Sequence, residues 1–299
     1  MKIIFMGTPD FACPTLQKLI ANDEFEIVAI YTRAPKIAGR GHKIINSPIH
    51  NLALQHNLKV ITPKTLRNEK IQQEFQNLNA DAAIIVAYGL ILPKKILEST
   101  KFGCINLHPS LLPRWRGPSP IQYNLLSGDK MGGVTIIQMN EGIDSGDILA
   151  KNEILLEKDE NYAELAPKLA NLGADLLIKT LFELKNNKIV AITQNHKLAT
   201  FSKKIAKNDA KIDFSLSAQE IERKIRAFRG SITAYFEHNG EQIKVFAAEI
   251  VDDARKKVGE IVNDRLVIQC GKGCIRPLIL QRAGRKMMKI EEFLLGFKI

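Results

Sequence analysis

Short apolar runs alternate with amphipathic stretches through the first 190 residues or so, and this alternation constrains the fold more than any other feature. The run Ala82–Ala87 is apolar at every position, which is typical of a strand buried on both faces. Such strands, separated by helices, form a mostly parallel sheet with helices on both sides. We predict strands at 3–6, 26–31, 59–61, 82–87 and 103–107, and helices at 10–20, 47–56 and 68–78. The sequence therefore predicts an α/β domain with a Rossmann-like, mostly parallel sheet.

Two of the predicted helices begin with residues suited to a helix start. Asp10 can cap the first helix, and Ser47 followed by Pro48 has the chemistry of a cap and a first helical residue. Residues 32–46, between the second strand and the second helix, are polar and rich in glycine and basic residues, so we expect a loop there. Long loops are uncommon inside compact domains, which suggests a functional role for this one and for its basic residues Arg40 and Lys43.

The pattern changes after the parallel part of the sheet. Strands expected at 134–139 and 148–156 lack an obvious helix between them, which indicates an antiparallel extension. A long helix is expected over 162–185. Residues 190–209 show little periodicity and many polar groups, which is typical of a linker. We therefore expect a first domain over 1–189, a linker over 190–209 and a second domain over 210–299.

The second domain shows a different texture. Ser217 and Glu220 have the spacing of a capping box, so a helix begins there. Short strand candidates separated by turn residues follow at 231–237, 242–250, 257–262, 265–269 and 274–281. Several short strands in succession suit a small all-β, OB-like barrel.

The net charge of +11 is unevenly placed along the 299 residues. Residues 1–189 hold 22 basic and 19 acidic side chains, whereas residues 190–299 hold 21 and 13. An excess of this kind suggests a polyanionic partner, most plausibly a nucleic acid. A lysine-rich surface kept for solubility explains the charge alone equally well.

The remaining composition excludes several classes of protein. The four cysteines form no paired Cys-x-x-Cys clusters, so no metal site is expected and the thiols suit a reduced, cytoplasmic location. No run of about 18 apolar residues occurs, so no membrane association is expected. The turn after the first strand, Gly7–Asp10, holds a single glycine and does not match a dinucleotide fingerprint, which argues against a nicotinamide cofactor.

Polar residues of chemical interest follow the last parallel strand. Asn106 and His108 are two positions apart, so they face the same side of an extended chain, and Pro109 favours that extended backbone at His108. An amide and an imidazole can together stabilise a developing oxyanion and accept a proton. Asp144 or Asp147, both in a glycine-rich turn, could orient the imidazole. Taken singly, each also suits a structural role, as a hydrogen-bonded strand-end histidine or a turn aspartate.

Nine segments spread along the chain are far more specific together than any one of them alone. They are FMGTPDF at 5–11, AGRG at 38–41, VAYGLILP at 86–93, NLHPSLLPRWRG at 106–117, GVTI at 133–136, GIDSGD at 142–147, SLSA at 215–218, IRAF at 225–228 and QRAGRK at 281–286. With these segments the chain resembles the formyltetrahydrofolate-dependent formyltransferase family over nearly its whole length. The Asn106/His108/Asp144 set marks the broad family, whereas the opening segment, the first long loop and the second domain favour its tRNA-directed members.

The resemblance implies that the formyl group of 10-formyltetrahydrofolate passes to the α-amino group of methionine esterified to initiator tRNA, for translation initiation. Asn106 and His108 would stabilise the oxyanion, His108 would also move the proton, and Asp144 would hold His108. Arg40 and Lys43 would contact the tRNA, and the basic second domain would hold its backbone. The implied folate pocket is lined by two short segments: Ser110, Leu111, Leu112, Pro113, Ala87, Tyr88, Gly89, Leu90, Ile91 and Leu92.

Two other functions remain open from the sequence. The same folate chemistry could act on an amino sugar or a ribonucleotide amine, although a small acceptor does not need the extra basic domain. A non-catalytic RNA-binding protein on the same scaffold is the other alternative, and the complete Asn106/His108/Asp144 set argues against it. We expect a monomer.

Overall fold

The structure is a computed structural model that describes residues 1–38, 43–252 and 254–297. It divides into two compact units, which are described separately. The first unit comprises residues 1–117, 132–154 and 166–201, and the second comprises residues 118–131, 155–165 and 202–299. The division into 1–189, 190–209 and 210–299 stays a prediction.

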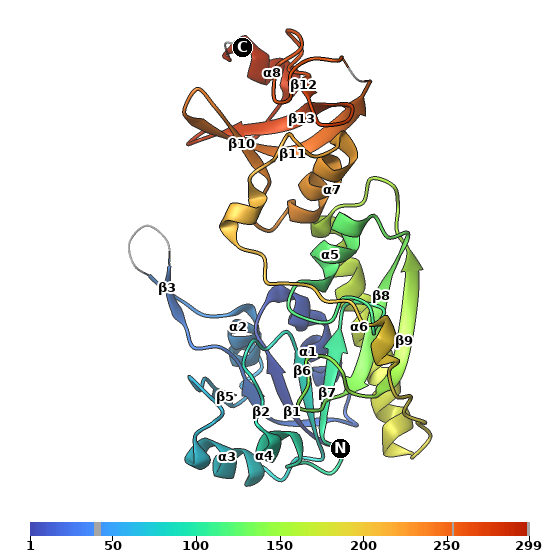
Figure 1. Cartoon of the computed structure of the whole chain (residues 1–299). Helices are drawn as coiled ribbons and strands as arrows, with labels where there is room; N and C mark the ends of the chain where they lie inside the picture. The colour runs from blue at the N-terminus through green and yellow to red at the C-terminus, as the bar shows by residue number, and fades with distance from the viewer. Residues whose placement is uncertain (39–42, 253, 298–299) are drawn as a thin grey trace. The chain divides into compact units, whose positions relative to one another are not determined.

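A seven-stranded sheet forms the centre of the first unit (Figure 1). The strand order is β5-β2-β1-β6-β7-β8-β9, with the first five strands parallel and β8 antiparallel to β7. The strands are β1 Lys2–Gly7, β2 Glu26–Tyr31, β5 Val60–Ile61, β6 Ala82–Val86, β7 Cys104–His108, β8 Met131–Gln138 and β9 Ile148–Leu155. The predicted parallel sheet and its antiparallel extension are both confirmed.

Both faces of this sheet are buried, which explains the uninterrupted apolar strands. In β1, Ile3 and Phe5 belong to one core cluster, which includes Leu16 of α1 and Leu177 of α6. The alternate residues of β1 belong to a second cluster on the other face, which includes Phe75 of α3. Period-two alternation thus divides a single strand between two cores. The helices are α1 Cys13–Ile20, α2 Pro48–Gln55, α3 Glu69–Gln76, α4 Lys94–Leu97 and α6 Tyr162–Lys185.

One of the two helix starts predicted in this unit follows the expected capping chemistry. Ser47 Oγ accepts from the backbone N–H of His50 at 3.0 Å, which caps α2, and Asn68 caps α3. The expectation that Asp10 caps α1 is wrong. Asp10 begins a 3₁₀ turn that ends at Ala12, and α1 starts only after it, with Pro14 in its first turn and no side-chain cap.

The segment 32–46 is not the irregular loop that its composition predicted. Strand β3 (Lys36–Ala38) pairs antiparallel with β4 (Lys43–Ile45), so a small hairpin forms. The β-branched residues Ile37, Ile44 and Ile45 favour extended backbone. The loop prediction rested on the glycine and polar residues of the segment and did not weigh these isoleucines. Lys43 begins β4, whereas Arg40 lies outside the described residues.

The second unit contains a curled antiparallel sheet, a half-barrel of order β10-β11-β13-β12 with β14 paired to β13 (Figure 1). Its elements are α5 Pro120–Ser127, α7 Ala218–Phe228, β10 Tyr235–His238, β11 Glu241–Val251, β12 Ile268–Gln269, β13 Cys274–Arg282, β14 Met288–Lys289 and α8 Ile290–Leu295. The predicted capping box opens α7: Ser217 Oγ accepts from the Glu220 N–H at 3.2 Å, and Glu220 accepts from the Ser217 N–H.

The predicted fold class, an α/β domain followed by a small all-β domain, is confirmed. One strand candidate of the second domain is wrong, because residues 257–262 form only an isolated bridge between Ile261 and Ile268. Within the ranges that the structure describes, no helix combines the length and apolarity needed to cross a bilayer.

Candidate active site

The order of the parallel strands favours ligand binding at the carboxyl ends of β1 and β6. From β1 the chain continues on one side to β2 and returns on the other side to β6, so the strand order reverses between them. The loops that follow the two strands are tied together, because Thr8 Oγ1 donates to the Tyr88 carbonyl at 2.9 Å. The neighbouring strand β7 ends at His108, next to β6.

Asn106, His108 and Asp144 meet at the carboxyl end of β7. Asn106 and His108 are 7% and 4% exposed, and they lie on the same side of the strand. Asn106 Nδ2 donates to Asp144 Oδ1 at 3.4 Å, and His108 Nδ1 lies 3.6 Å from Asp144 Oδ2. The backbone N–H of Gly117 donates to the same Oδ2 at 2.8 Å. The carboxylate is thus shared by an amide, an imidazole and a backbone N–H.

The second ring nitrogen of His108 faces the backbone. Nε2 lies 3.0 Å from the carbonyl oxygen of Trp115, which can only accept, so Nε2 carries the proton in this arrangement. Trp115 adopts the left-handed backbone conformation, with φ of 59°. His108 therefore has an acceptor on each side of its ring, Trp115 O and Asp144 Oδ2.

The four predicted folate residues that follow β7 form a loop fixed to strand β8. Thr135 Oγ1 donates to the Ser110 carbonyl at 2.7 Å and accepts from the Leu112 N–H at 3.1 Å. Ser110 Oγ donates to the Arg114 carbonyl at 2.6 Å. The side chain of Leu112 is fully buried in a cluster with residues of β8 and β9, whereas Leu111 and Pro113 are half-buried. The loop is rigid at one side and accessible at the other.

The six predicted folate residues that follow β6 divide into core and surface. Tyr88 and Leu92 are buried, and burial raises the pKa of the Tyr88 hydroxyl. Ala87, Gly89 and Ile91 are exposed, and Leu90 is half-buried. Ala87 and Gly89 have φ of 49° and 82°, so their left-handed backbone turns the chain sharply after the strand. Tyr88 and Leu92 can therefore line a crevice only with their backbone groups.

A residue that the sequence reasoning missed completes the site. Gln194 is 3% exposed, and its side-chain Nε2 donates to the carbonyls of Asp144 and Gly146 at 2.9 and 2.7 Å. Its Oε1 accepts from Arg116 Nε and Nη2 at 3.1 and 2.7 Å. Burial lowers the pKa of Arg116, and the nearby Asp144 carboxylate opposes that shift. No local pattern marked Gln194, because the surrounding residues lack periodicity.

The arrangement suits attack on a carbonyl carbon without a metal. A buried amide and an imidazole N–H can donate to an oxyanion, and the imidazole can carry a proton. Among the described residues, no group of three or more His, Cys, Asp or Glu side chains could hold a metal ion.

Comparison with known proteins assigns the family. A family model described as formyl transferase matches residues 1–181, and one described as formyl transferase, C-terminal domain, matches residues 204–298. The chain belongs to the formyl transferase family. The resemblance inferred from the sequence motifs is therefore confirmed.

Curated members of the formyl transferase family match the chain from end to end. The methionyl-tRNA formyltransferase of Rickettsia africae is 45% identical over 300 aligned residues, which cover 100% of this chain and 98% of the relative. That of Rickettsia prowazekii is 44% identical with the same coverage. Among solved structures, the sugar 3N-formyl transferase WlaRD, in the presence of dTdp and 5-N-Formyl-THF, has a TM-score of 0.69 at 19% identity. The match covers 96% of this chain and 99% of WlaRD. At this identity the likeness supports the fold alone.

Proposed function

We propose that this chain transfers the formyl group of 10-formyltetrahydrofolate to the α-amino group of methionyl initiator tRNA. The observation that carries the proposal is the full-length identity of 45% to a methionyl-tRNA formyltransferase, which extends through the second domain. The buried meeting of Asn106, His108 and Asp144 supports a group-transfer reaction at that site.

The side chains at the end of β7 have complementary tasks in this reaction. The amine nitrogen forms a bond to the formyl carbon, and the bond from that carbon to N10 of the folate breaks. Asn106 Nδ2 donates to the oxygen that becomes negative in between. His108 reacts from the tautomer that carries its proton on Nδ1, beside Asp144 Oδ2, which leaves Nε2 free to take the proton that the amine loses. The Nε2–H formed in this way donates to the oxyanion and then passes its proton to N10, so that the imidazole ends as it began.

Asp144 makes this cycle possible by its position. Its Oδ2 lies beside His108 Nδ1, where a carboxylate stabilises the charge that the ring gains with the proton. The Gly117 N–H holds the same oxygen in place. The oxyanion competes with the Trp115 carbonyl for the His108 Nε2–H, so formation of the oxyanion shifts this N–H from one acceptor to the other.

The folate co-substrate occupies the crevice between the loops after β6 and β7. Ser110–Pro113 and Ala87–Leu92 line it, partly with backbone N–H and C=O groups. Hydrogen bonds with Thr135 hold the loop Ser110–Pro113 before the folate binds, and a hydrogen bond from Thr8 holds the loop Ala87–Leu92. Such preformed walls reduce the ordering cost of binding.

The tRNA contacts come from the basic residues. Arg40 reaches the acceptor stem, and Lys43, at the start of β4, contacts the tRNA. The second domain, over 210–299, holds the tRNA backbone through its excess of Lys and Arg. The enzyme acts as a monomer in the cytoplasm, where its four cysteines are free thiols.

The decisive experiment measures transfer of labelled formyl from 10-formyltetrahydrofolate to several acceptors. These are charged initiator tRNA, uncharged initiator tRNA, charged elongator methionine tRNA, a nucleotide-linked amino sugar and a ribonucleotide amine. Transfer to charged initiator tRNA alone supports the proposal. Transfer to a small amine but not to tRNA overturns the choice of acceptor, and tRNA binding without any transfer overturns the catalytic role.

A further inference from the structure

The buried amide of Gln194 links the loop that carries Asp144 to Arg116. All four contacts of this side chain lie between 2.7 and 3.1 Å, two from its nitrogen and two to its oxygen. A guanidinium can only donate and a backbone carbonyl can only accept, so the orientation of the amide is fixed by chemistry. A glutamine meets both demands at once, whereas a glutamate or a lysine of similar length meets only one.

The loop that Gln194 holds has an unusual path. Asp144 has a φ of 45°, in the left-handed region that few non-glycine residues adopt. A Cβ added at Gly146 would lie 1.7 Å from the Gln138 carbonyl oxygen, so the chain passes directly against β8. Gln194 donates to the carbonyls on both sides of Ser145, and thereby fixes the peptide units that set the direction of the Asp144 side chain.

The contacts of the Asp144 carboxylate make this support important. Its distances to Asn106 Nδ2 and His108 Nδ1 are 3.4 and 3.6 Å, near the upper limit for useful interaction. A displacement of about 1 Å would therefore remove both contacts, and misplacement of that size can reduce turnover about a hundredfold. The Gly117 N–H holds only one carboxylate oxygen. The other contacts of the loop run to its neighbouring residues, from Ser145 Oγ to Asn140 and from the Gln138 N–H to the Asp147 carbonyl. Gln194 therefore adds a tie to the distant Arg116.

We propose that Gln194, itself held by Arg116, is a positioning residue that fixes Asp144 against His108. The proposal rests on the proposed formyl transfer, because it assigns to Gln194 an effect that acts only through Asp144. Gln194 lies in a segment predicted to be a linker, so the chemistry of the site depends on a part of the chain that carries none of the recognised motifs.

Two substitutions of Gln194 separate positioning from stability. Gln194→Glu keeps an acceptor for Arg116 but loses the N–H donors, and it should lower the single-turnover rate of formyl transfer about tenfold or more. Gln194→Leu removes both the acceptor for Arg116 and the N–H donors to the loop carbonyls. The matched control is Gln72, a 7% exposed glutamine of α3 whose Nε2 donates to the Leu66 carbonyl at 2.9 Å. Gln72→Glu should leave the rate within about twofold of the unsubstituted chain.

A double-substitution cycle gives the readout that a merely structural role would not move. In the Asp144→Ala background, Gln194→Glu should change the rate less than about twofold, because the group it positions is gone. Affinity for charged tRNA should stay unchanged in every variant. Equal rate losses from Gln194→Glu with and without Asp144, or a loss matched by Gln72→Glu, would overturn the proposal.

The two failures can be told apart. If the unsubstituted chain transfers no formyl group, the proposed function fails. If it transfers formyl and Asp144→Ala slows it, but Gln194→Glu does not, only the role of Gln194 fails.

Discussion

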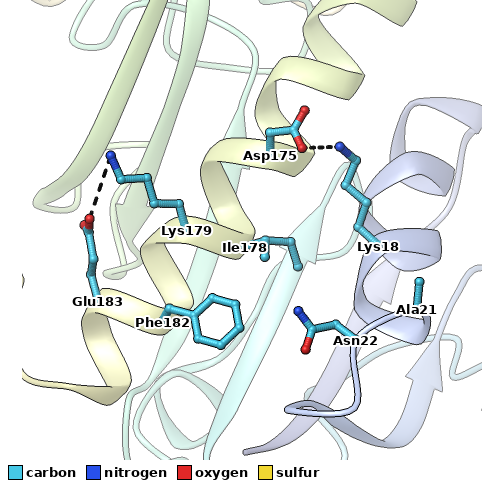
Figure 2. A pocket seen from close by; sticks show the side chains of 8 residues that line it. All are labelled: Lys18, Ala21, Asn22, Asp175, Ile178, Lys179, Phe182 and Glu183. Carbon is cyan, nitrogen blue, oxygen red and sulfur yellow. Dashed lines mark hydrogen bonds and ion pairs between the residues drawn. The ribbon is translucent and has the colours of Figure 1, made fainter.

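The first unit carries two polar clusters that differ in almost every respect. At the carboxyl ends of the strands, Asn106 and His108 are buried, and Asp144 is shared between them. Between α1 and α6, which cover one face of the sheet, lies a hollow of about 630 Å³ where Lys18 pairs with Asp175 (Figure 2). These two side chains are 36% and 69% exposed.

Exposure to water distinguishes the two clusters. Exposed ion pairs exchange freely with solvent and are screened by salt, so they hold no fixed geometry. In the buried cluster, each group is placed by a strand end or a backbone contact, and water does not weaken its field. A surface hollow is therefore by itself a poor guide to function here, whereas converging buried polar groups are a better one.

The largest loss of transfer rate is expected on substitution of His108. His108→Ala should reduce the rate of formyl transfer by about two orders of magnitude or more, because it removes both the proton carrier and one oxyanion donor. Single-turnover assays with saturating folate and charged tRNA measure this. Lys18→Ala, in the exposed cluster, is the control and should leave the rate unchanged. An unchanged rate in His108→Ala would remove this residue from the mechanism.

Asp144→Asn should have the next largest effect. The substitution keeps the size of the side chain but loses the charge beside His108 Nδ1, and it places a donor where an acceptor is needed. Loss of a hydrogen bond to a charged group costs about 1.5–3 kcal/mol. The rate should therefore fall about tenfold to a hundredfold. The affinity for folate, measured by equilibrium binding, should change little, and a large loss of affinity would instead assign Asp144 to the folate pocket.

Much of the fold could be predicted because its signals are local. The all-apolar run at 82–87 and the Ser47-Pro48 start need only periodicity and capping chemistry. The wrong predictions concern short segments whose conformation is not decided by one side chain or by composition. Asp10 has the right side chain for a cap, but the chain makes a 3₁₀ turn first. The hairpin at 36–45 depends on pairing between two short isoleucine-containing segments rather than on composition.

The candidate site shows the same limit. Asn106 and His108 could be placed on one side of a strand by counting residues, and the structure brings Asp144 to them. Their assignment to catalysis stays a prediction. Gln194 could not be found, because its partners lie 50 and 78 positions away along the chain. Only the folded chain brings an isolated glutamine to two carbonyls and a guanidinium.

The apolar packing beneath the exposed ion pairs of α1 and α6 should affect stability but not the transfer reaction. Phe182 lines the hollow between α1 and α6 (Figure 2). Its ring centroid lies 5.2 Å from that of Phe25. Phe182→Ala should lower the free energy of unfolding by about 1–3 kcal/mol, because the side chain is only half-buried. Urea unfolding followed by circular dichroism measures the loss. The transfer rate of the folded fraction should stay at its original value. A parallel loss of rate would show that the packing between α1 and α6 is coupled to the cluster of Asn106, His108 and Asp144.

The smallest effect is expected at the ion pair between Lys18 and Asp175. Both side chains are solvated before and after pairing, so their attraction is offset by the entropy lost in holding two flexible side chains. A double-mutant cycle with Lys18→Ala and Asp175→Ala should give a coupling free energy of about 0–1 kcal/mol, reduced further in 1 M salt. A coupling of several kcal/mol would mean that this ion pair is shielded from water. The contrast with the buried cluster would then no longer rest on exposure.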